Sequence, residues 1–292
     1  EASFAREYES RWSGTVEDAF FNGEFFDRNR KLQKPEYEHS GRSAANAYYI
    51  LSVDVGRKGC DSVVCVFKVT PQAQGPAIKS LVNIYTFADE HFEDQAIRIK
   101  KLYYKYKART IVIDGNGLGI GLVDYMIKSQ EDENGDFFPD FGVENDEDGY
   151  YKKYRTANTE FDAMYILKAN APINTECHAN AQTQLQAGKV KFLIDERGAK
   201  EKLLATKMGQ NMKPEERAEY LKPFTLTSIL KEEMMNLREE NEGVNIILKQ
   251  ANRGIRKDKF SAFEYGLYYI KQEEDKKKKK KKFNAADWAF FN

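Results

Sequence analysis

A buried strand that ends in a carboxylate is the feature that most constrains this chain of 292 residues. In the segment YYILSVDVG (48–56), five of the six residues before Asp54 are apolar or aromatic. The run is too short for a buried helix and has the length of a buried strand, so we predict a strand over Tyr48–Val55. A charged side chain inside such a strand is costly unless a cation compensates it.

Two interpretations of Asp54 follow from its position. Side chains alternate along a strand, so Ile50, Ser52 and Asp54 are expected on one face. Asp54 either caps the turn at Gly56 or binds a metal ion. The strand alone does not distinguish a structural carboxylate from a metal ligand.

The elements around this strand predict the fold class. Two more strands follow at hairpin spacing and are therefore expected to be antiparallel, whereas a strand that follows a helix is expected to be parallel to the first strand. We expect an α/β domain with a mixed β-sheet, three antiparallel strands then parallel strands, flanked by helices, which is the element order of the RNase H-like fold. The predicted elements are strands Ser62–Thr70 and Lys79–Phe87, helix Asp94–Tyr106, strand Arg109–Asp114 and helix Gly117–Lys128.

The second half of the chain alternates between helical and strand patterns. Residues 131–148 carry nine acidic residues and no basic residue, which favours a solvated loop. Seven consecutive lysines, Lys276–Lys282, favour a disordered solvated tract. The other predicted elements are strands Ala163–Ala169, Val190–Asp195 and Val244–Gln250, and helices Ile173–Gln186, Glu196–Met208, Lys213–Glu219, Thr227–Leu237 and Asp258–Ile270.

Composition excludes several classes of protein. The formal net charge is zero, so overall charge gives no argument for a nucleic-acid partner. Three Cys and three His supply neither a disulfide framework nor a zinc site, and no apolar run has membrane-spanning length. The chain lacks GxxxxGK[ST], and its glycine run after Asp114 fails the GxGxxG pattern at Ile120.

A second carboxylate, Asp114, stands at the end of a predicted buried strand in IVIDGNGLGIG. If this strand lies beside the first, Asp54 and Asp114 are neighbours at one edge of the sheet. Two close carboxylates repel one another and do not both ionise without a cation. Mg²⁺ or Mn²⁺ supplies that cation, since hard metals bind carboxylate oxygens.

A third candidate, Asp258, opens the last predicted helix. Small residues at Ser261 and Ala262 share its helical face and would allow that face to approach a sheet. The structural alternative is a carboxylate that interacts with the helix dipole. Asp195, which ends another predicted strand, is the rival third ligand and ranks below Asp258.

Four basic residues surround Asp258: Arg253, Arg256, Lys257 and Lys259. A local basic patch at the mouth of a metal site suits the DNA phosphate backbone. The alternative is an ordinary solvated turn.

Five segments together resemble the nuclease domain of phage large terminase subunits, over roughly Tyr48 to Ile270. They are VDVGRKG, VIDGNGLGIGLVDYM, KFLIDERGAKEKLLATKMG, LTSILKEEMMNL and KDKFSAFEYGLYYI. The resemblance implies an RNase H-like endonuclease that cuts concatemeric double-stranded viral DNA during genome packaging. By motif match, it implies that Asp54, Asp114 and Asp258 form the catalytic, metal-binding triad of a two-metal phosphodiester hydrolysis with Mg²⁺ or Mn²⁺.

The resemblance also implies a domain organisation and partners. Residues 1–47 would be the linker or tail of a preceding ATPase domain, 48–275 the nuclease domain, and 276–292 a lysine-rich tract and C-terminal tail. The expected partners are double-stranded DNA and, in the full-length context, an ATPase motor domain, a portal and a small terminase subunit. A monomeric isolated domain in the cytoplasm of the infected bacterial host, without membrane association, is expected.

Three other functions stay open at the level of sequence. A Holliday-junction resolvase or integrase-like nuclease would share the fold. An actin/sugar-kinase-type ATPase would use the turn after the first strand to hold phosphate and metal, and would bind nucleotide without cutting DNA. An interaction module with a degenerate site is a third alternative, against which the presence of all three carboxylates argues.

Overall fold

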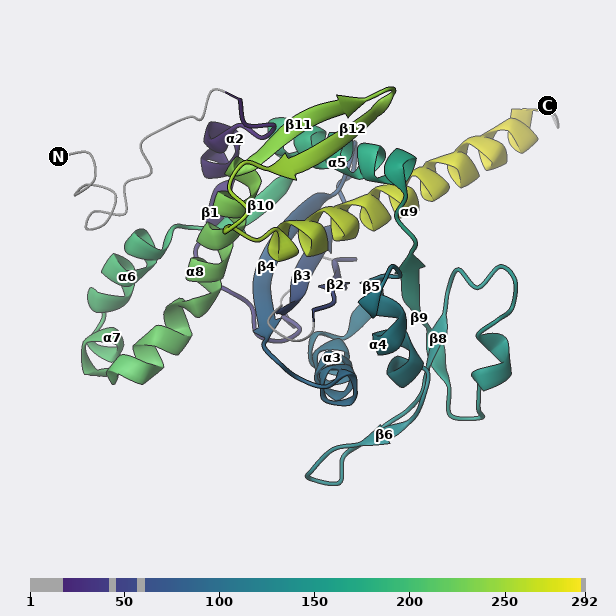
Figure 1. The fold of residues 1–292 in the computed structure, drawn as a ribbon, viewed down its shortest axis with the longest axis horizontal. Helices are drawn as coiled ribbons and strands as arrows, with labels where there is room; N and C mark the ends of the chain where they lie inside the picture. The colour runs from purple at the N-terminus through teal and green to yellow at the C-terminus, as the bar shows by residue number, and fades with distance from the viewer. Residues whose placement is uncertain (1–17, 42–45, 57–60, 290–292) are drawn as a thin grey trace.

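The computed structural model describes residues 18–41, 46–56 and 61–289, and its centre is one eight-stranded sheet (Figure 1). The strand order is β1-β10-β4-β3-β2-β5-β9-β8. The strands are β1 (Arg30–Leu32), β2 (Tyr48–Asp54), β3 (Ser62–Thr70), β4 (Ile78–Phe87), β5 (Ala108–Asp114), β8 (Phe141–Val143), β9 (Glu160–Leu167) and β10 (Val190–Leu193).

The directions of the strands confirm the predicted fold class. Strands β2, β3 and β4 are successive antiparallel neighbours. On one side, β5 is parallel to β2, and β9 and β8 continue in parallel; on the other side, β10 is parallel to β4 and β1 is parallel to β10. The sheet is therefore mixed, with three antiparallel strands at its centre and parallel strands beyond them.

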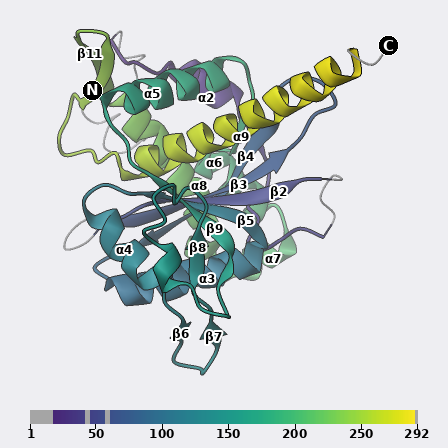
Figure 2. The same cartoon turned by 90° about the vertical axis from the view of Figure 1, so that its right-hand side faces the viewer.

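Helices cover both faces of the sheet (Figures 1 and 2). Helices α3 and α4 cover one face, while α9 crosses the other face with α5 and α8 beside it. The helices are α2 (Gly23–Arg28), α3 (Phe92–Tyr106), α4 (Leu118–Met126), α5 (Ala171–Gln186), α6 (Glu196–Leu204), α7 (Lys207–Asn211), α8 (Pro214–Met235) and α9 (Asp258–Ala289), with a 3₁₀ turn η1 at Lys152–Tyr154.

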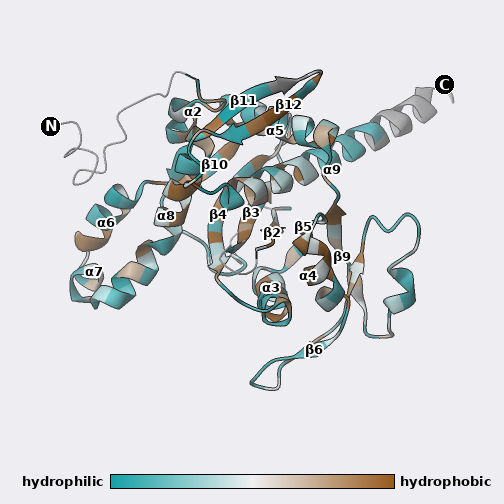
Figure 3. Ribbon diagram, viewed as in Figure 1, coloured by the Kyte–Doolittle hydropathy of each residue, from teal (hydrophilic) through white to brown (hydrophobic). Residues whose placement is uncertain are grey.

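The hydrophobic core is divided by the sheet into two clusters, as the alternation along β2 requires. Ile50 belongs to the cluster under α9, whereas Leu51 and Val53 belong to the cluster under α3 and α4. Figure 3 shows the apolar residues gathered on the central strands and on the inward faces of the helices. Both faces of β2 are buried, which explains its nearly continuous apolar sequence.

The N-terminal flank packs on this core from residue 18 onwards. Phe21 and Phe26 are fully buried, and the Phe26 ring stacks on Phe192 of β10 at 3.9 Å between centroids. Strand β1 extends the sheet by pairing with β10. The aromatics of this segment therefore find their packing surface within the chain, while residues 1–17 lie outside the described residues. The origin of this segment in an ATPase domain stays a prediction.

The acidic segment 131–148 is not the simple solvated loop that its charge predicted. It contains a short hairpin, β6 (Gln130–Glu131) with β7 (Phe137–Phe138), and the edge strand β8. Phe141 and Val143 of β8 are buried against β9. Asp140, directly before β8, is also buried, and its carboxylate accepts hydrogen bonds from the hydroxyls of Thr156 and Thr159.

Helix α8 is longer than the sequence predicted. It runs from Pro214 to Met235 through Pro223, where the sequence favoured two separate helices. A proline inside a helix costs about 3 kcal/mol. The burial of Leu221, Phe224 and Leu230 offsets that cost, since each side chain packs into the core. Other differences are a break between α6 and α7 and the pairing of β11 (Leu237–Glu242) with β12 (Asn245–Gln250).

The lysine run lies within a helix, contrary to the expected disordered tract. Helix α9 continues through Lys276–Lys282 to Ala289 and extends away from the sheet (Figure 1). Lysine is a good helix former, and the buried first half of α9 nucleates the helix. Among the helices of the described residues, none is both long enough and apolar enough to span a membrane.

Two of the three cysteines lie in the described core. Cys65 and Cys177 are buried free thiols. Cys60 lies outside the described residues, as do residues 57–59 of the VDVGRKG segment.

Candidate metal centre

Asp54 and Asp114 end two adjacent parallel strands. The register pairs Ser52 with Val112 and Val53 with Ile113, so the two aspartates follow at the same carboxyl edge of the sheet. Adjacent strands lie about 4.8 Å apart. By alternation, Asp54 lies on the face of β2 that Ile50 presents to α9. The tertiary structure thus brings together two carboxylates that are 60 residues apart in sequence.

The loop after Asp114 is built around close backbone packing. The Asp114 Oδ1 accepts a 3.0 Å hydrogen bond from the amide of Asn116, which turns the chain away from the strand. A Cβ at Gly119 would lie 1.6 Å from the Asp114 carbonyl oxygen. Glycine is therefore required for α4 to begin directly against the end of β5, and the glycine run has this structural role.

Asp258 is delivered to the same region by α9. This helix packs on β2, β3 and β5. It packs tightly on the sheet at Gly266, where a Cβ would lie 2.5 Å from the Phe67 ring and 2.9 Å from the Ser52 Cβ. The sequence predicted a close contact with the sheet through the small residues Ser261 and Ala262. Gly266, about one turn further along the helix, also makes such a contact.

The charges of Asp258 and Asp114 both act on Asp54. Burial, and then the charges of Asp258 and Asp114, raise the pKa of Asp54 to about 8. Burial also raises the pKa of Asp114 and of Asp258. Repulsion of Asp54 by two other carboxylates is the expected property of a group gathered to hold a cation.

The carboxylates of the site are suitable ligands for a divalent cation, but they do not form a complete set of metal ligands. Among the described residues, the buried Oδ2 of Asp258 has no hydrogen-bond partner, and the Arg256 guanidinium lies 3.8 Å from it. Carboxylate oxygens are the ligands that Mg²⁺ and Mn²⁺ prefer. Within the part of the chain that the structure describes, no group of three or more His, Cys, Asp or Glu side chains is arranged to hold a metal ion.

Two further carboxylates near the site were missed by the sequence reasoning. Asp61, directly before β3, lies close enough to raise the pKa of Asp258. Its position beside a strand end was a usable signal. Glu233 of α8 is buried, and burial raises its pKa to about 7. Nothing in the helical sequence EEMM distinguishes Glu233 from its neighbours.

The four predicted basic residues divide into two groups. Arg253, Arg256 and Lys257 are exposed, and the Lys257 charge lowers the pKa of both Asp54 and Asp114. Lys259 differs, because only 7% of it is exposed and its ammonium lies 3.2 Å from the Glu233 carboxylate. The expectation that Lys259 faces phosphate is therefore at odds with its burial and its ion pair.

Asp195, the rival third ligand, has a different structural role. It is the N-cap of α6, and its Oδ1 accepts a 2.8 Å hydrogen bond from the amide of Gly198. Its strand, β10, is separated from β2 by β4 and β3. The carboxylate is thus used locally, three strands away from Asp54.

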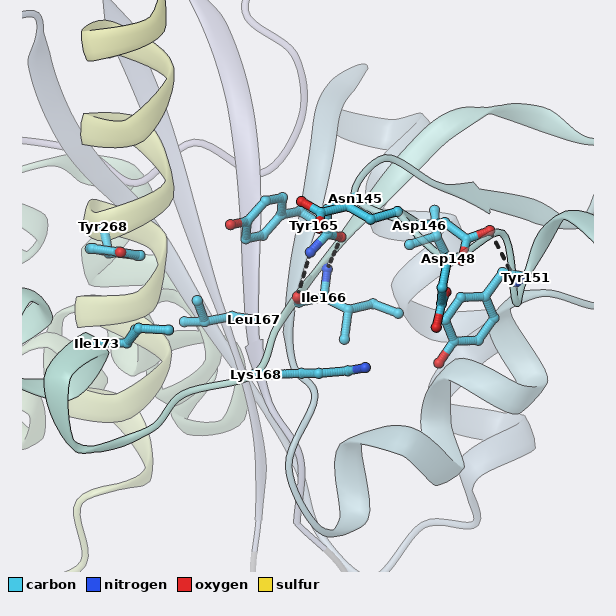
Figure 4. A pocket seen from close by; sticks show the side chains of 12 residues that line it. Asn145, Asp146, Asp148, Tyr151, Tyr165, Ile166, Leu167, Lys168, Ile173 and Tyr268 are labelled. Carbon is cyan, nitrogen blue, oxygen red and sulfur yellow. Dashed lines mark hydrogen bonds between the residues drawn. The ribbon is translucent and has the colours of Figure 1, made fainter.

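A cavity of about 480 Å³ lies beside the site, at the β8–β9 edge (Figure 4). Asp146, Tyr151 and Lys168 line it, and Tyr268 of α9 closes its other side. None of the three site aspartates lines this cavity. The candidate metal centre is therefore separate from this cavity.

Among known proteins, this chain is similar to several solved structures. No family model matches the chain, and no curated protein matches it. The large terminase nuclease from thermophilic phage G20c with bound magnesium is 13% identical, with a TM-score of 0.46 over 86% of this chain and 96% of that chain. The P22 large terminase nuclease domain is 12% identical, with a TM-score of 0.41 over 85% of this chain and 89% of that chain.

A longer protein is also similar. The HK97 bacteriophage large terminase is 6% identical, with a TM-score of 0.44 over 86% of this chain and 43% of that chain. The structural similarity is thus to large terminase nucleases of several phages. Identities and TM-scores are low throughout, so the functional proposal for this chain depends on its own residues.

Proposed function

We propose that this chain is a metal-dependent endonuclease that cuts concatemeric double-stranded viral DNA during genome packaging. The observation that carries the proposal is that β2 and β5 end side by side and place Asp54 and Asp114 at one edge of the sheet, where the charge of Asp258 also acts on Asp54. Such a cluster is costly without a cation, and it is reached only by folding three distant segments together. The sequence resemblance to large terminase nucleases points to the same chemistry.

Each aspartate has a proposed role in holding two Mg²⁺ or Mn²⁺ ions. The charges of Asp114 and Asp258 both act on Asp54, so Asp54 would be a ligand of both ions. Asp114 would be a further ligand of one ion, and Asp258 of the other. Such ions, when bound, lower the pKa of a water molecule and neutralise developing charge on phosphate oxygens. The protein holds the carboxylates at the ends of rigid elements, β2, β5 and α9, which preorganises the site.

Exposed cations beside the carboxylates would bind the DNA backbone. Arg253, Arg256 and Lys257 are exposed at the start of α9, and Lys257 lies within electrostatic range of Asp54. Contacts to phosphates position DNA without reading its sequence. Cutting is therefore expected to depend little on base sequence.

The wider context is part of the same proposal. An ATPase motor domain before residue 48, a portal and a small terminase subunit are the partners that packaging requires. The lysine-bearing end of α9 would follow the nuclease domain from residue 276. The isolated nuclease domain would be monomeric and would act in the cytoplasm of the infected bacterial host.

Plasmid digestion tests the nuclease function directly. Supercoiled plasmid is incubated with Mg²⁺, with Mn²⁺ or with EDTA, and relaxed and linear products are followed without added nucleotide. Cutting is expected with either metal and not in EDTA, and Asp54→Asn is expected to be inactive. Undiminished cutting in EDTA, or by Asp54→Asn, would exclude the metal mechanism. Nucleotide binding without any DNA cleavage would instead favour the ATPase alternative.

A further inference from the structure

An exposed patch of aromatic and basic side chains lies outside the candidate metal centre. It is the segment Tyr150–Arg155, YYKKYR, in the excursion between β8 and β9 at the edge of the sheet (Figure 1). Tyr150 is 51% exposed and Tyr154 is 40% exposed. Aromatic rings at this exposure are not packed in the core, so much of their apolar surface is accessible to a partner.

The backbone under this patch is held in place. The amides of Tyr151 and Lys152 donate to the Asp146 Oδ2 at 3.0 and 3.1 Å. The 3₁₀ turn η1 closes with hydrogen bonds from Tyr154 to Tyr151 and from Arg155 to Lys152, at 3.1 and 3.2 Å. The two exposed rings therefore project from a fixed turn. Little conformational entropy of the backbone is lost when a ligand binds them.

The rings and the cations form one unit. The ring centroids of Tyr150 and Tyr154 are 6.1 Å apart at an interplanar angle of 60°. The Lys153 Nζ lies 4.1 Å from the Tyr150 centroid and 4.9 Å from the Tyr154 centroid. Arg155 pairs with Asp162, whereas neither Lys152 nor Lys153 pairs with a carboxylate within the described residues. The patch thus combines two aromatic faces with two cations available to an anion.

This combination matches one class of ligand. Bases inside a duplex are already stacked on one another, so exposed protein rings gain from bases only where the strand is unpaired. Base stacking contributes about 5- to 150-fold in affinity per base. An exposed cation–π contact contributes only about 2- to 5-fold. A base can therefore displace Lys153 from the rings and leave its ammonium for a phosphate.

We propose that the Tyr150–Arg155 patch binds unpaired DNA, by stacking bases on Tyr150 and Tyr154 and by pairing phosphates with Lys152 and Lys153. The inference rests on the proposed function only in its choice of DNA among polyanions. The patch lies at the β8–β9 edge, where Tyr151 lines a cavity together with Lys168.

Fluorescence anisotropy with a labelled thymidine 15-mer and a duplex of the same length, both in EDTA, tests the inference. Tyr150→Ala combined with Tyr154→Ala is expected to raise the Kd for the single strand at least 10-fold and to change the duplex Kd less than 2-fold. The corresponding double Phe variant keeps both rings and is expected to bind as the parent does. Tyr37→Ala is the matched control, because Tyr37 is also 40% exposed but lies in the N-terminal flank.

Four results would overturn the inference. They are no measurable binding of the single strand by the parent, an unchanged Kd in the double Ala variant, an equal loss of duplex binding, and an equal loss in Tyr37→Ala. Binding in EDTA does not depend on cleavage, so an inactive parent in the plasmid assay would challenge the proposed nuclease and leave the anisotropy result interpretable. Lys152→Gln adds a second readout, since one lost phosphate contact lowers the salt slope for single strands by about 0.7.

Discussion

The Glu233 carboxylate of α8 accepts a 2.9 Å hydrogen bond from the amide of Phe260, in the first turn of α9. The same carboxylate lies 3.2 Å from the ammonium of Lys259. One buried acid from another helix therefore satisfies a free amide at the start of α9 and neutralises a buried lysine. It holds the turn that carries Asp258.

Glu233→Gln is expected to destabilise the fold by about 3–5 kcal/mol, because Lys259 is left as an unpaired buried cation. Urea denaturation at pH 8 measures this, with Glu232→Gln in the same turn as the matched control, since Glu232 is less buried. Glu233→Gln combined with Lys259→Met is expected to be more stable than Glu233→Gln alone. A double variant that is less stable than the single variant would contradict the ion-pair explanation.

Asp54→Asn is expected to stabilise the metal-free protein at high pH. The pKa of Asp54 is raised from 3.8 to about 8, so the folded state binds a proton that the unfolded chain has lost between these values. The free energy of unfolding of the parent therefore falls as pH rises from about 4 to about 8. In EDTA, the difference in Tm between Asp54→Asn and the parent is expected to grow over this range, by about 2–4 °C per kcal/mol.

Metal is expected to reverse that order. Mg²⁺ binds the folded parent and raises its Tm, more at pH 8 than at pH 6, since the ligand must lose its proton first. Asp54→Asn is expected to gain little from Mg²⁺ at either pH. Differential scanning calorimetry with and without 10-fold excess EDTA over metal distinguishes the two proteins. An equal gain in Tm for both would place the metal elsewhere.

Asp258→Asn and Asp195→Asn are expected to differ in the plasmid assay. Asn at 258 removes a charge from the carboxylate cluster, so cleavage is expected to fall to background with the fold intact. Asn at 195 remains a good N-cap for α6, so this variant is expected to cut nearly as well as the parent. The reverse outcome would show that Asp195 is the third ligand, although the nuclease proposal could stand.

Lys257 and Lys259 are two positions apart and are expected to respond differently to neutralisation. Lys257→Gln removes an exposed cation, so the salt slope of duplex binding is expected to fall by about 0.9 with little loss of stability. Lys259→Gln leaves the buried Glu233 carboxylate without its ion-pair partner, so this variant is expected to have a lower free energy of unfolding. Arg253→Gln is a second exposed position and is expected to behave as Lys257→Gln does. Equal slopes for the parent and a Lys257→Gln/Arg253→Gln double variant would place the DNA surface elsewhere.

Gly266→Ala is expected to separate α9 from the sheet. The added Cβ would lie 2.5 Å from the Phe67 ring and 2.9 Å from the Ser52 Cβ. Overpacking of this kind costs about 1–3 kcal/mol, more than the 0.5–1 kcal/mol that Ala contributes in a helix. Thermal unfolding measures the loss. Gly41→Ala, where nothing lies within 4 Å, is the control and is expected to change Tm little.

The amino-acid sequence by itself determined the central strands and the positions of two site carboxylates, Asp54 and Asp114. Strand β3 has the predicted bounds, and β2 and β4 differ from prediction by one residue at one end. These strands are buried on both faces, so local hydrophobicity alone defines them. Their ends also place Asp54 and Asp114, because a polar residue after such a run marks where the strand leaves the core.

Only the tertiary structure decided the elements and roles that depend on distant partners. Strand β8 forms because β9 offers a free edge, and α8 continues through Pro223 because the core receives Leu221 and Phe224. Lys259 and Glu233 were indistinguishable from surface residues until the helices packed and buried both charges against each other. Asp195 and Asp258 likewise differ in surroundings and not in residue type. Asp195 caps a local helix, whereas the charge of Asp258 acts on Asp54 at the end of β2. Burial and long-range charge are properties of the folded chain, and local sequence carries neither.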